Sequence, residues 1–135
     1  MQHRIGFVNG CFDILHIGHI RLLKFAKSKC DHLIVCIDSN ERVKKMKGQS
    51  RPFNSEILRK ETLMALESVD QVEIFDSSQE LIGLIKAYHP DIMVVGSDYR
   101  DKVVIGSQYA KQLIFFDRIE GYSTSKIIES FSDRG

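Results

Sequence analysis

The stretch "NGCFDILHIGHIRLLKFAK" (Asn9–Lys27) carries two histidines, His16 and His19, three residues apart. The run just before it, RIGFV (Arg4–Val8), is short and β-type, and the Asn-Gly pair that follows is typical of a turn. Apolar residues then recur at helical spacing through the rest of the stretch, so residues 16–27 are predicted to form a helix. The order predicts a strand, a turn and a helix that carries both histidines on one face of its first turn.

This setting favours an anion site at the histidine pair. Gly10 allows close backbone approach, and the start of a helix presents unpaired N–H groups and a positive dipole end. Gly18 leaves space beside the pair, and imidazoles can donate hydrogen bonds to phosphate or, when protonated, add positive charge. Two alternatives compete: histidines that are merely solvated or satisfied, and zinc ligands, although Cys11 and Asp13 do not complete a recognised zinc spacing. Neither a Walker loop nor GxGxxG is present.

Four further β-type runs follow along the chain. They are HLIVCI (His32–Ile37), QVEIF (Gln71–Phe75), DIMVV (Asp91–Val95) and QLIFF (Gln112–Phe116). Helices are predicted over Glu56–Glu67 after a Ser55 cap, over Gln79–Tyr88, and after the hydroxyl-rich Ser123-Thr124-Ser125. The polar segment Asp38–Asn54 is predicted to be a long working loop.

Strands that alternate with helices predict right-handed crossovers and a parallel sheet. We therefore expect one domain over residues 1–135, with a three-layer α/β fold and a five-stranded parallel sheet. Ligands of such sheets bind beyond the carboxyl ends of the strands. Unusual residues follow four of the five predicted strands, so the site is expected at that edge.

Composition restricts the partners. The 135 residues include 19 Lys plus Arg and 18 Asp plus Glu, a net charge of +1, so the chain lacks the basic excess of a nucleic-acid-binding protein. No apolar run approaches the length of a membrane span, and we expect no membrane partner. The three cysteines show no CxxC spacing and no leader pattern precedes the first strand, which favours the cytoplasm.

The motif "GCFDILHIGH" resembles the first signature of the cytidylyltransferase-like nucleotidyltransferases, the HxGH branch of the HIGH superfamily. Three later segments resemble later motifs of the family, in the same order. They are "MKGQSRP" (Met46–Pro52), "VVGSDYR" (Val94–Arg100) and "RIEGYSTSKII" (Arg118–Ile128). The resemblance covers nearly the whole chain and implies a Rossmann-like fold.

Such enzymes transfer a nucleoside monophosphate from a nucleoside triphosphate (NTP) to a phosphorylated acceptor and release pyrophosphate. The acceptor phosphate supplies the nucleophile, so the enzyme mainly positions the reactants and neutralises charge at the α-phosphate. The resemblance assigns that task to His16 and His19, and assigns Lys47, or Lys44, to a loop that closes over the triphosphate. A solvated charge run is the alternative for these lysines.

The resemblance also implies a wider set of binding residues. The expected nucleotide-binding residues are Gly10, Cys11, Phe12, Gly18, Lys44, Gly96, Asp98, Arg118, Ser123, Thr124 and Ser125. The three hydroxyl residues could equally cap a helix. Asp13 and Arg59 are expected at the acceptor, with an exposed helical position as an equal alternative for Arg59. Cys11 is expected to contribute no thiol chemistry.

The motifs leave the substrate open. "NGCFDILHIGH", "MKGQSRP" and "GSDYRDKVVIGSQYA" resemble heptose 1-phosphate adenylyltransferase domains, which favours ATP and a sugar 1-phosphate. "RIEGYSTSKI" is closer to glycerol-3-phosphate cytidylyltransferases, which use CTP. The family further implies Mg²⁺ with the triphosphate and a homodimer. A nucleotide-binding sensor without catalysis is the alternative from another class.

Overall fold

A parallel sheet runs through the middle of the molecule. The computed structural model describes residues 3–117, and within them five strands pair in the order β3-β2-β1-β4-β5. All pairings between neighbouring strands are parallel, which confirms the predicted sheet. The strands are β1 (Ile5–Gly10), β2 (His32–Asp38), β3 (Gln71–Phe75), β4 (Ile92–Gly96) and β5 (Gln112–Phe116).

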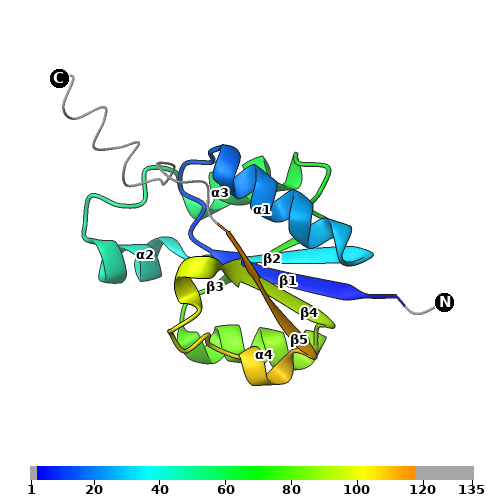
Figure 1. Ribbon diagram of the computed structural model, residues 1–135. Coiled ribbons are helices and arrows are strands. Elements are labelled where there is room, and N and C mark those ends of the chain that lie inside the picture. The colour runs from blue at the N-terminus through cyan, green and yellow to red at the C-terminus, as the bar shows by residue number, and fades with distance from the viewer. Residues whose placement is uncertain (1–2, 118–135) are drawn as a thin grey trace.

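Helices cover both faces of this sheet, which confirms the three-layer α/β fold. The helices are α1 (Ile17–Ser28), α2 (Asn40–Lys47), α3 (Glu56–Met64) and α4 (Ser78–Tyr88), with short 3-10 turns η1 (Ser97–Tyr99) and η2 (Ser107–Tyr109). Figure 1 shows α1 and α3 over one face, α4 under the other, and α2 beyond the edge where the strands end. No helix within residues 3–117 has the length and apolar character needed to span a bilayer.

Two apolar cores separate these layers. Leu23 of α1 and Leu63 of α3 pack with one face of β1 and β2, while Leu81 and Ile85 of α4 pack with the other. The strand between them, β2, is buried from Leu33 to Ile37. Burial on both faces explains its unbroken apolar run, since neither face can be polar.

The strand order creates a switch point between β1 and β4. The chain moves outward from β1 to β2 and β3 through helices on one face, then returns to β4 through α4 on the other. Because the connections after β1 and β4 leave toward opposite faces, a crevice forms at their carboxyl ends, where sheets of this type bind ligands.

The expected loop from Asp38 to Asn54 is wrong in its first half, which is helix α2. The Ser39 side chain caps this helix by accepting from the Arg42 N–H, and the one buried helix residue, Val43, anchors it. Gly48 ends it at φ +103°, a left-handed conformation that favours glycine. Val43 and Met46 are the two apolar residues among the eight, too few to establish a repeat, so the Ser39 cap was the clearest sequence signal for this helix.

Two further boundaries differ from the prediction. Asn9 and Gly10, predicted to form a turn, extend β1 because they pair with Cys36 and Ile37 of β2. The apolar repeat of α3 located the helix, which ends at Met64, but not its buried face: Ile57 and Leu58 are exposed, whereas Arg59 is buried. The predicted C-terminal helix lies outside the described residues.

Candidate active site

The two histidines begin α1 together. His16 is the N-cap, and its Nδ1 accepts the Gly18 N–H at 3.0 Å. His19, one turn on, accepts the His16 N–H at its own Nδ1 at 3.3 Å, which completes a capping box. The two rings stack with their centroids 3.8 Å apart. The helix start therefore fixes both imidazoles side by side.

These hydrogen bonds determine the tautomer of both histidines. An Nδ1 that accepts an N–H carries no proton, so each neutral ring holds its proton on Nε2. Protonation of Nδ1 would replace an acceptor by a donor and break the cap. With each Nδ1 accepting a backbone N–H, Nε2 is the ring nitrogen of each histidine that can donate to a ligand. Two imidazole donors at a helix N-terminus suit the oxygens of a phosphate chain.

Phe12 supports the pair from the core side. Phe12 is 6% exposed, and its ring meets that of His19 edge-on, with the centroids 5.0 Å apart. Phe12 adopts φ +50°, unusual for a residue with a side chain. A Cβ on Gly10 would lie 3.0 Å from this ring. Gly10 therefore makes room for Phe12, and Phe12 can offer a ligand its backbone but hardly its side chain.

Asp13 holds a loop in place. Its carboxylate is fully buried and accepts from Phe53 N at 2.8 Å, Asn54 N at 2.8 Å and Arg51 Nε at 3.2 Å. Asn54 Nδ2 also donates to the Asp13 carbonyl. We call Arg51–Asn54 the strap, since Asp13 ties it to the turn after β1. A carboxylate buried and occupied in this way argues against the expected acceptor role of Asp13.

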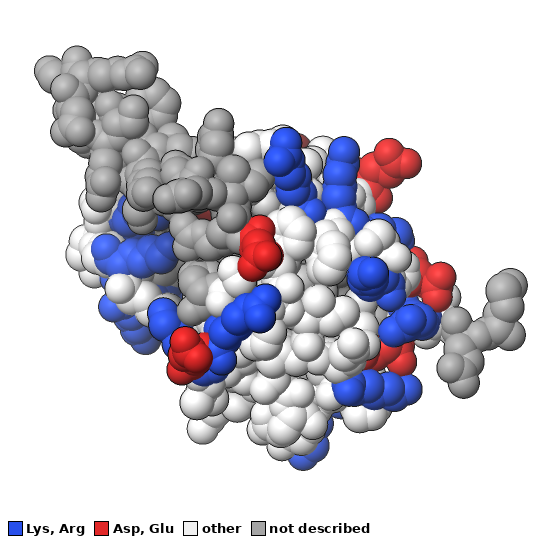
Figure 2. All heavy atoms as spheres, viewed as in Figure 1, with Lys and Arg blue, Asp and Glu red and all other residues white. Residues whose placement is uncertain are grey.

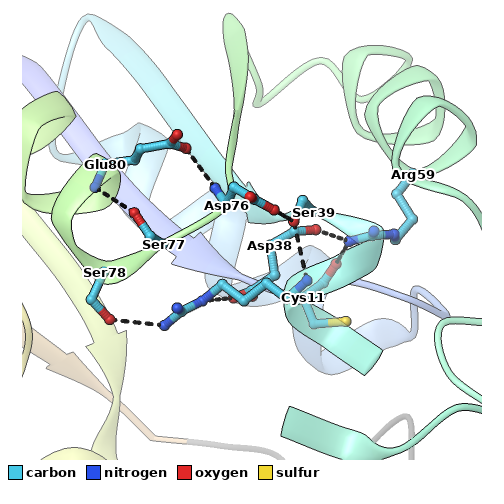
Figure 3. Close-up of polar contacts among 9 residues, drawn as sticks. Cys11, Asp38, Ser39, Arg59, Asp76, Ser77, Ser78 and Glu80 are labelled. Atoms are coloured by element: carbon cyan, nitrogen blue, oxygen red, sulfur yellow. Dashed lines mark hydrogen bonds and ion pairs between the residues drawn. The ribbon is translucent and has the colours of Figure 1, made fainter. Parts of the chain in front are cut away.

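The Arg59 side chain connects the turn after β1, the end of β2 and the strap. It is 1% exposed, so the exposed helical position considered from sequence is wrong. Its Nη1 donates to the carbonyls of Cys11 at 3.0 Å and Asp38 at 2.7 Å (Figure 3). Its Nε donates to the carbonyl of Asn54. Its Nη2 donates to Asn40 Oδ1. These contacts occupy Nε, Nη1 and Nη2 of the guanidinium, which argues against the expected contact of Arg59 with the acceptor.

A second polar network fixes the ends of β2 and β3. Arg42 Nε donates to Asp38 Oδ1 at 2.8 Å and its Nη2 to Ser78 Oγ at 3.2 Å. Ser39 Oγ donates to Asp76 Oδ1 at 2.5 Å (Figure 3). The starts of α2 and α4 are therefore tied together, on the β2 side of the histidine pair.

Lys47 is close enough to the turn after β1 to influence Cys11. Burial raises the pKa of the Cys11 thiol, and the Lys47 ammonium is the strongest opposing influence. The thiol remains neutral, in accord with its lack of assigned chemistry. Lys44 instead lies 3.9 Å from Glu41. Figure 2 shows Lys and Arg side chains gathered over α2, so this side of the site edge is locally positive.

Some of the remaining expected residues lie within the described part of the chain and others lie outside it. Gly18 donates its N–H to His16, and Gly96 ends β4 just before η1, which contains Asp98. Arg118, Ser123, Thr124 and Ser125 lie outside the described residues. Within residues 3–117, no group of three or more His, Cys, Asp or Glu side chains comes together to hold a metal.

Two residues that hydrogen-bond to Asp13 were not predicted individually from the sequence. Arg51 and Asn54 belong to the polar segment Asp38–Asn54, which has no periodic pattern. Arg51 lies inside the motif "MKGQSRP". The resemblance was thus the one signal that could have singled it out.

The switch point, the stacked histidines at the start of α1 and the positive edge of the sheet define a nucleotidyltransferase domain. The chain belongs to the cytidylyltransferase-like family, whose model matches residues 7–130. This result confirms the family inferred from the motifs.

Individual relatives of the chain are similar to it over nearly its whole length. The chain is 50% identical to the bifunctional protein HldE of Campylobacter jejuni subsp. doylei, over 97% of this chain and 28% of that protein. It is 48% identical to HldE of Helicobacter hepaticus, over 96% of this chain and 27% of that protein. The chain thus spans under a third of the length of these relatives.

Solved structures show the same fold. A lipopolysaccharide core biosynthesis protein from Thermoplasma volcanium superposes with a TM-score of 0.72 at 24% identity, covering 88% of this chain and all of that one. A bifunctional NMN adenylyltransferase/ADP ribose pyrophosphatase from Francisella tularensis gives 0.71 at 14% identity, covering 99% of this chain and 43% of that one.

Proposed function

We propose that this protein transfers AMP from ATP to a sugar 1-phosphate such as heptose 1-phosphate and releases pyrophosphate. The stacked pair His16 and His19 carries the proposal, because it places two imidazoles at a helix start beside the switch point. The motif resemblance to heptose 1-phosphate adenylyltransferase domains and the identity to HldE support the choice of donor and acceptor. We further propose a cytoplasmic homodimer with no nucleic-acid or membrane partner.

The chemistry follows from these groups. An oxygen of the acceptor phosphate attacks the α-phosphorus of ATP, forming a new P–O bond as the bond to the β-phosphate oxygen breaks and pyrophosphate leaves. The nucleophile is already anionic, so no strong base is needed. The Nε2–H groups of His16 and His19 stabilise the charge that develops on the phosphoryl oxygens.

Mg²⁺ fits this site as a companion of the triphosphate. The described residues offer no cage of three ligands, and Mg²⁺ usually keeps several waters and binds substrate phosphates with one or two carboxylates. Asp98, on η1 at the end of β4, is the residue we assign to contact Mg²⁺, the base or the ribose. Bound there, the ion would neutralise phosphate charge.

A donor-by-acceptor panel tests this function. The protein is incubated with ATP or CTP, Mg²⁺, and either heptose 1-phosphate or glycerol 3-phosphate, and pyrophosphate release is followed. We expect ATP with heptose 1-phosphate to give a kcat/KM at least about tenfold above every other pair. A preference for CTP with glycerol 3-phosphate would favour the cytidylyltransferase alternative, and nucleotide binding without pyrophosphate release the sensor.

Lys47 should contribute to triphosphate binding. Replacing Lys47 with Ala is expected to raise KM for ATP about tenfold or more, because one charge-assisted contact to phosphate is lost. The control is Lys60→Ala, which removes an exposed lysine from α3 and should leave KM unchanged. Steady-state pyrophosphate assays measure both variants. Wild-type kinetics in Lys47→Ala would transfer the role to Lys44.

A further inference from the structure

One buried donor stands out among residues 3–117. Arg51 Nη2 is the buried side-chain nitrogen that has no hydrogen-bond partner. Buried polar atoms are almost always paired, because an unpaired one loses its hydration without compensation. An unpaired donor at the edge of a binding site is explained if a ligand supplies the acceptor.

The contacts of Asp13 explain why this nitrogen is left over. The Arg51 side chain is 11% exposed and reaches the carboxylate through Nε alone, at 3.2 Å. Two backbone N–H groups, from Phe53 and Asn54, already occupy the same carboxylate. A guanidinium can bind an anion with two parallel donors, yet here its second edge is not used by Asp13.

The position of Arg51 suits a contact with the acceptor phosphate. The strap leads into α3, which packs beside β2 and β3, so Arg51 lies on the β2 side of β1. The switch point lies on the β4 side of the same strand. Asp13, which accepts from Arg51, stands three residues before His16, so the strap is tied to the turn that leads into the histidine pair. In-line transfer requires the acceptor and the leaving pyrophosphate on opposite sides of the α-phosphorus.

We propose that Arg51 Nη2 donates to the phosphate of the sugar 1-phosphate acceptor. This proposal rests on the proposed transferase function and names its acceptor-binding residue. Arg51 orients the attacking phosphate and offsets its charge, and it transfers no proton. Asp13 fixes the guanidinium through Nε, which leaves Nη2 as the donor for the acceptor phosphate.

Titration calorimetry on the purified protein tests this role. Heptose 1-phosphate and ATP are each titrated into the wild type, Arg51→Lys and Arg51→Met. We expect the Kd for heptose 1-phosphate to rise at least about tenfold in both variants, and that for ATP to change less than about threefold. The Lys variant keeps a charge that can pair with Asp13, so a loss there reports the missing Nη2 donor.

The control is Arg42→Lys, the same substitution at a second arginine that pairs with a carboxylate but whose Nη2 is bonded to Ser78. It should lower Tm as a structural change does and leave both Kd values within about threefold. Equal changes in both Kd values for Arg51→Lys, no change in either, or no heptose 1-phosphate binding by the wild type would each overturn the proposal.

The two proposals fail in different ways. If the wild type releases pyrophosphate and Arg51→Lys keeps the wild-type KM for heptose 1-phosphate, the role of Arg51 falls and the transferase function stands. If no substrate pair yields pyrophosphate, the function falls, while the heptose 1-phosphate titration still decides whether Arg51 binds the sugar phosphate.

Discussion

The His19→Ala variant is expected to lose about 10²–10³-fold in kcat while KM for ATP changes by less than tenfold. The Nε2–H of His19 is one of two donors fixed at the start of α1, and it acts on charge that grows as the α-phosphate is attacked. An interaction that strengthens in the transition state lowers kcat when it is removed, but it affects ground-state affinity little. Pyrophosphate release under saturating substrates measures this loss.

A second substitution separates catalysis from helix capping. His19→Ala also removes the acceptor of the His16 N–H, a loss of about 1 kcal/mol in stability. In His19→Asn, the side-chain oxygen can still accept that N–H, but no donor stands where Nε2 was. We therefore expect Asn to restore Tm and to leave kcat low. If Asn restored both, or if Ala kept the wild-type kcat, His19 would have a structural role alone.

The Arg59→Met variant is expected to lower the free energy of unfolding by about 3–5 kcal/mol. The change removes four donated hydrogen bonds and leaves the Cys11, Asp38 and Asn54 carbonyls without this donor in a buried setting. Urea unfolding followed by circular dichroism measures the loss, and Tm should fall by about 10 °C.

Arg21→Met is the matched control for this stability measurement. Arg21 is exposed on α1, so the same chemical change should alter the free energy of unfolding by less than about 0.5 kcal/mol. If Arg59→Met and Arg21→Met were equally stable, Arg59 would not hold the strand ends together, and a direct role at the acceptor would regain support.

The sheet could be read from the sequence because its strands are locally distinctive. QVEIF and QLIFF, bounded by polar residues, gave β3 and β5 with their observed bounds. The turn predicted at Asn9-Gly10 was wrong for a physical reason. Cys36 and Ile37 of β2 pair with these two residues and extend β1 through them. A neighbouring strand distant in sequence thus overrode a local turn preference.

The site could be predicted only in part. The histidine pair was recognised because it sits in one short motif at a strand-to-helix junction. The burial of Arg59 and the strap depends on contacts between segments 38 to 48 residues apart, which no local pattern encodes. The apolar repeat of α3 predicted the wrong buried face. Ile57 and Leu58 are exposed, whereas Arg59 is buried.

The bond between Asp13 and the strap has a consequence for chimeras of this family. The turn after β1 and the loop before α3 are remote in sequence but form one hydrogen-bonded unit through Asp13, Arg51 and Asn54. A graft that exchanges either segment alone would combine a buried carboxylate with a foreign loop. Acceptor preference should therefore be transplanted between relatives only when residues 11–13 and 51–54 are moved together.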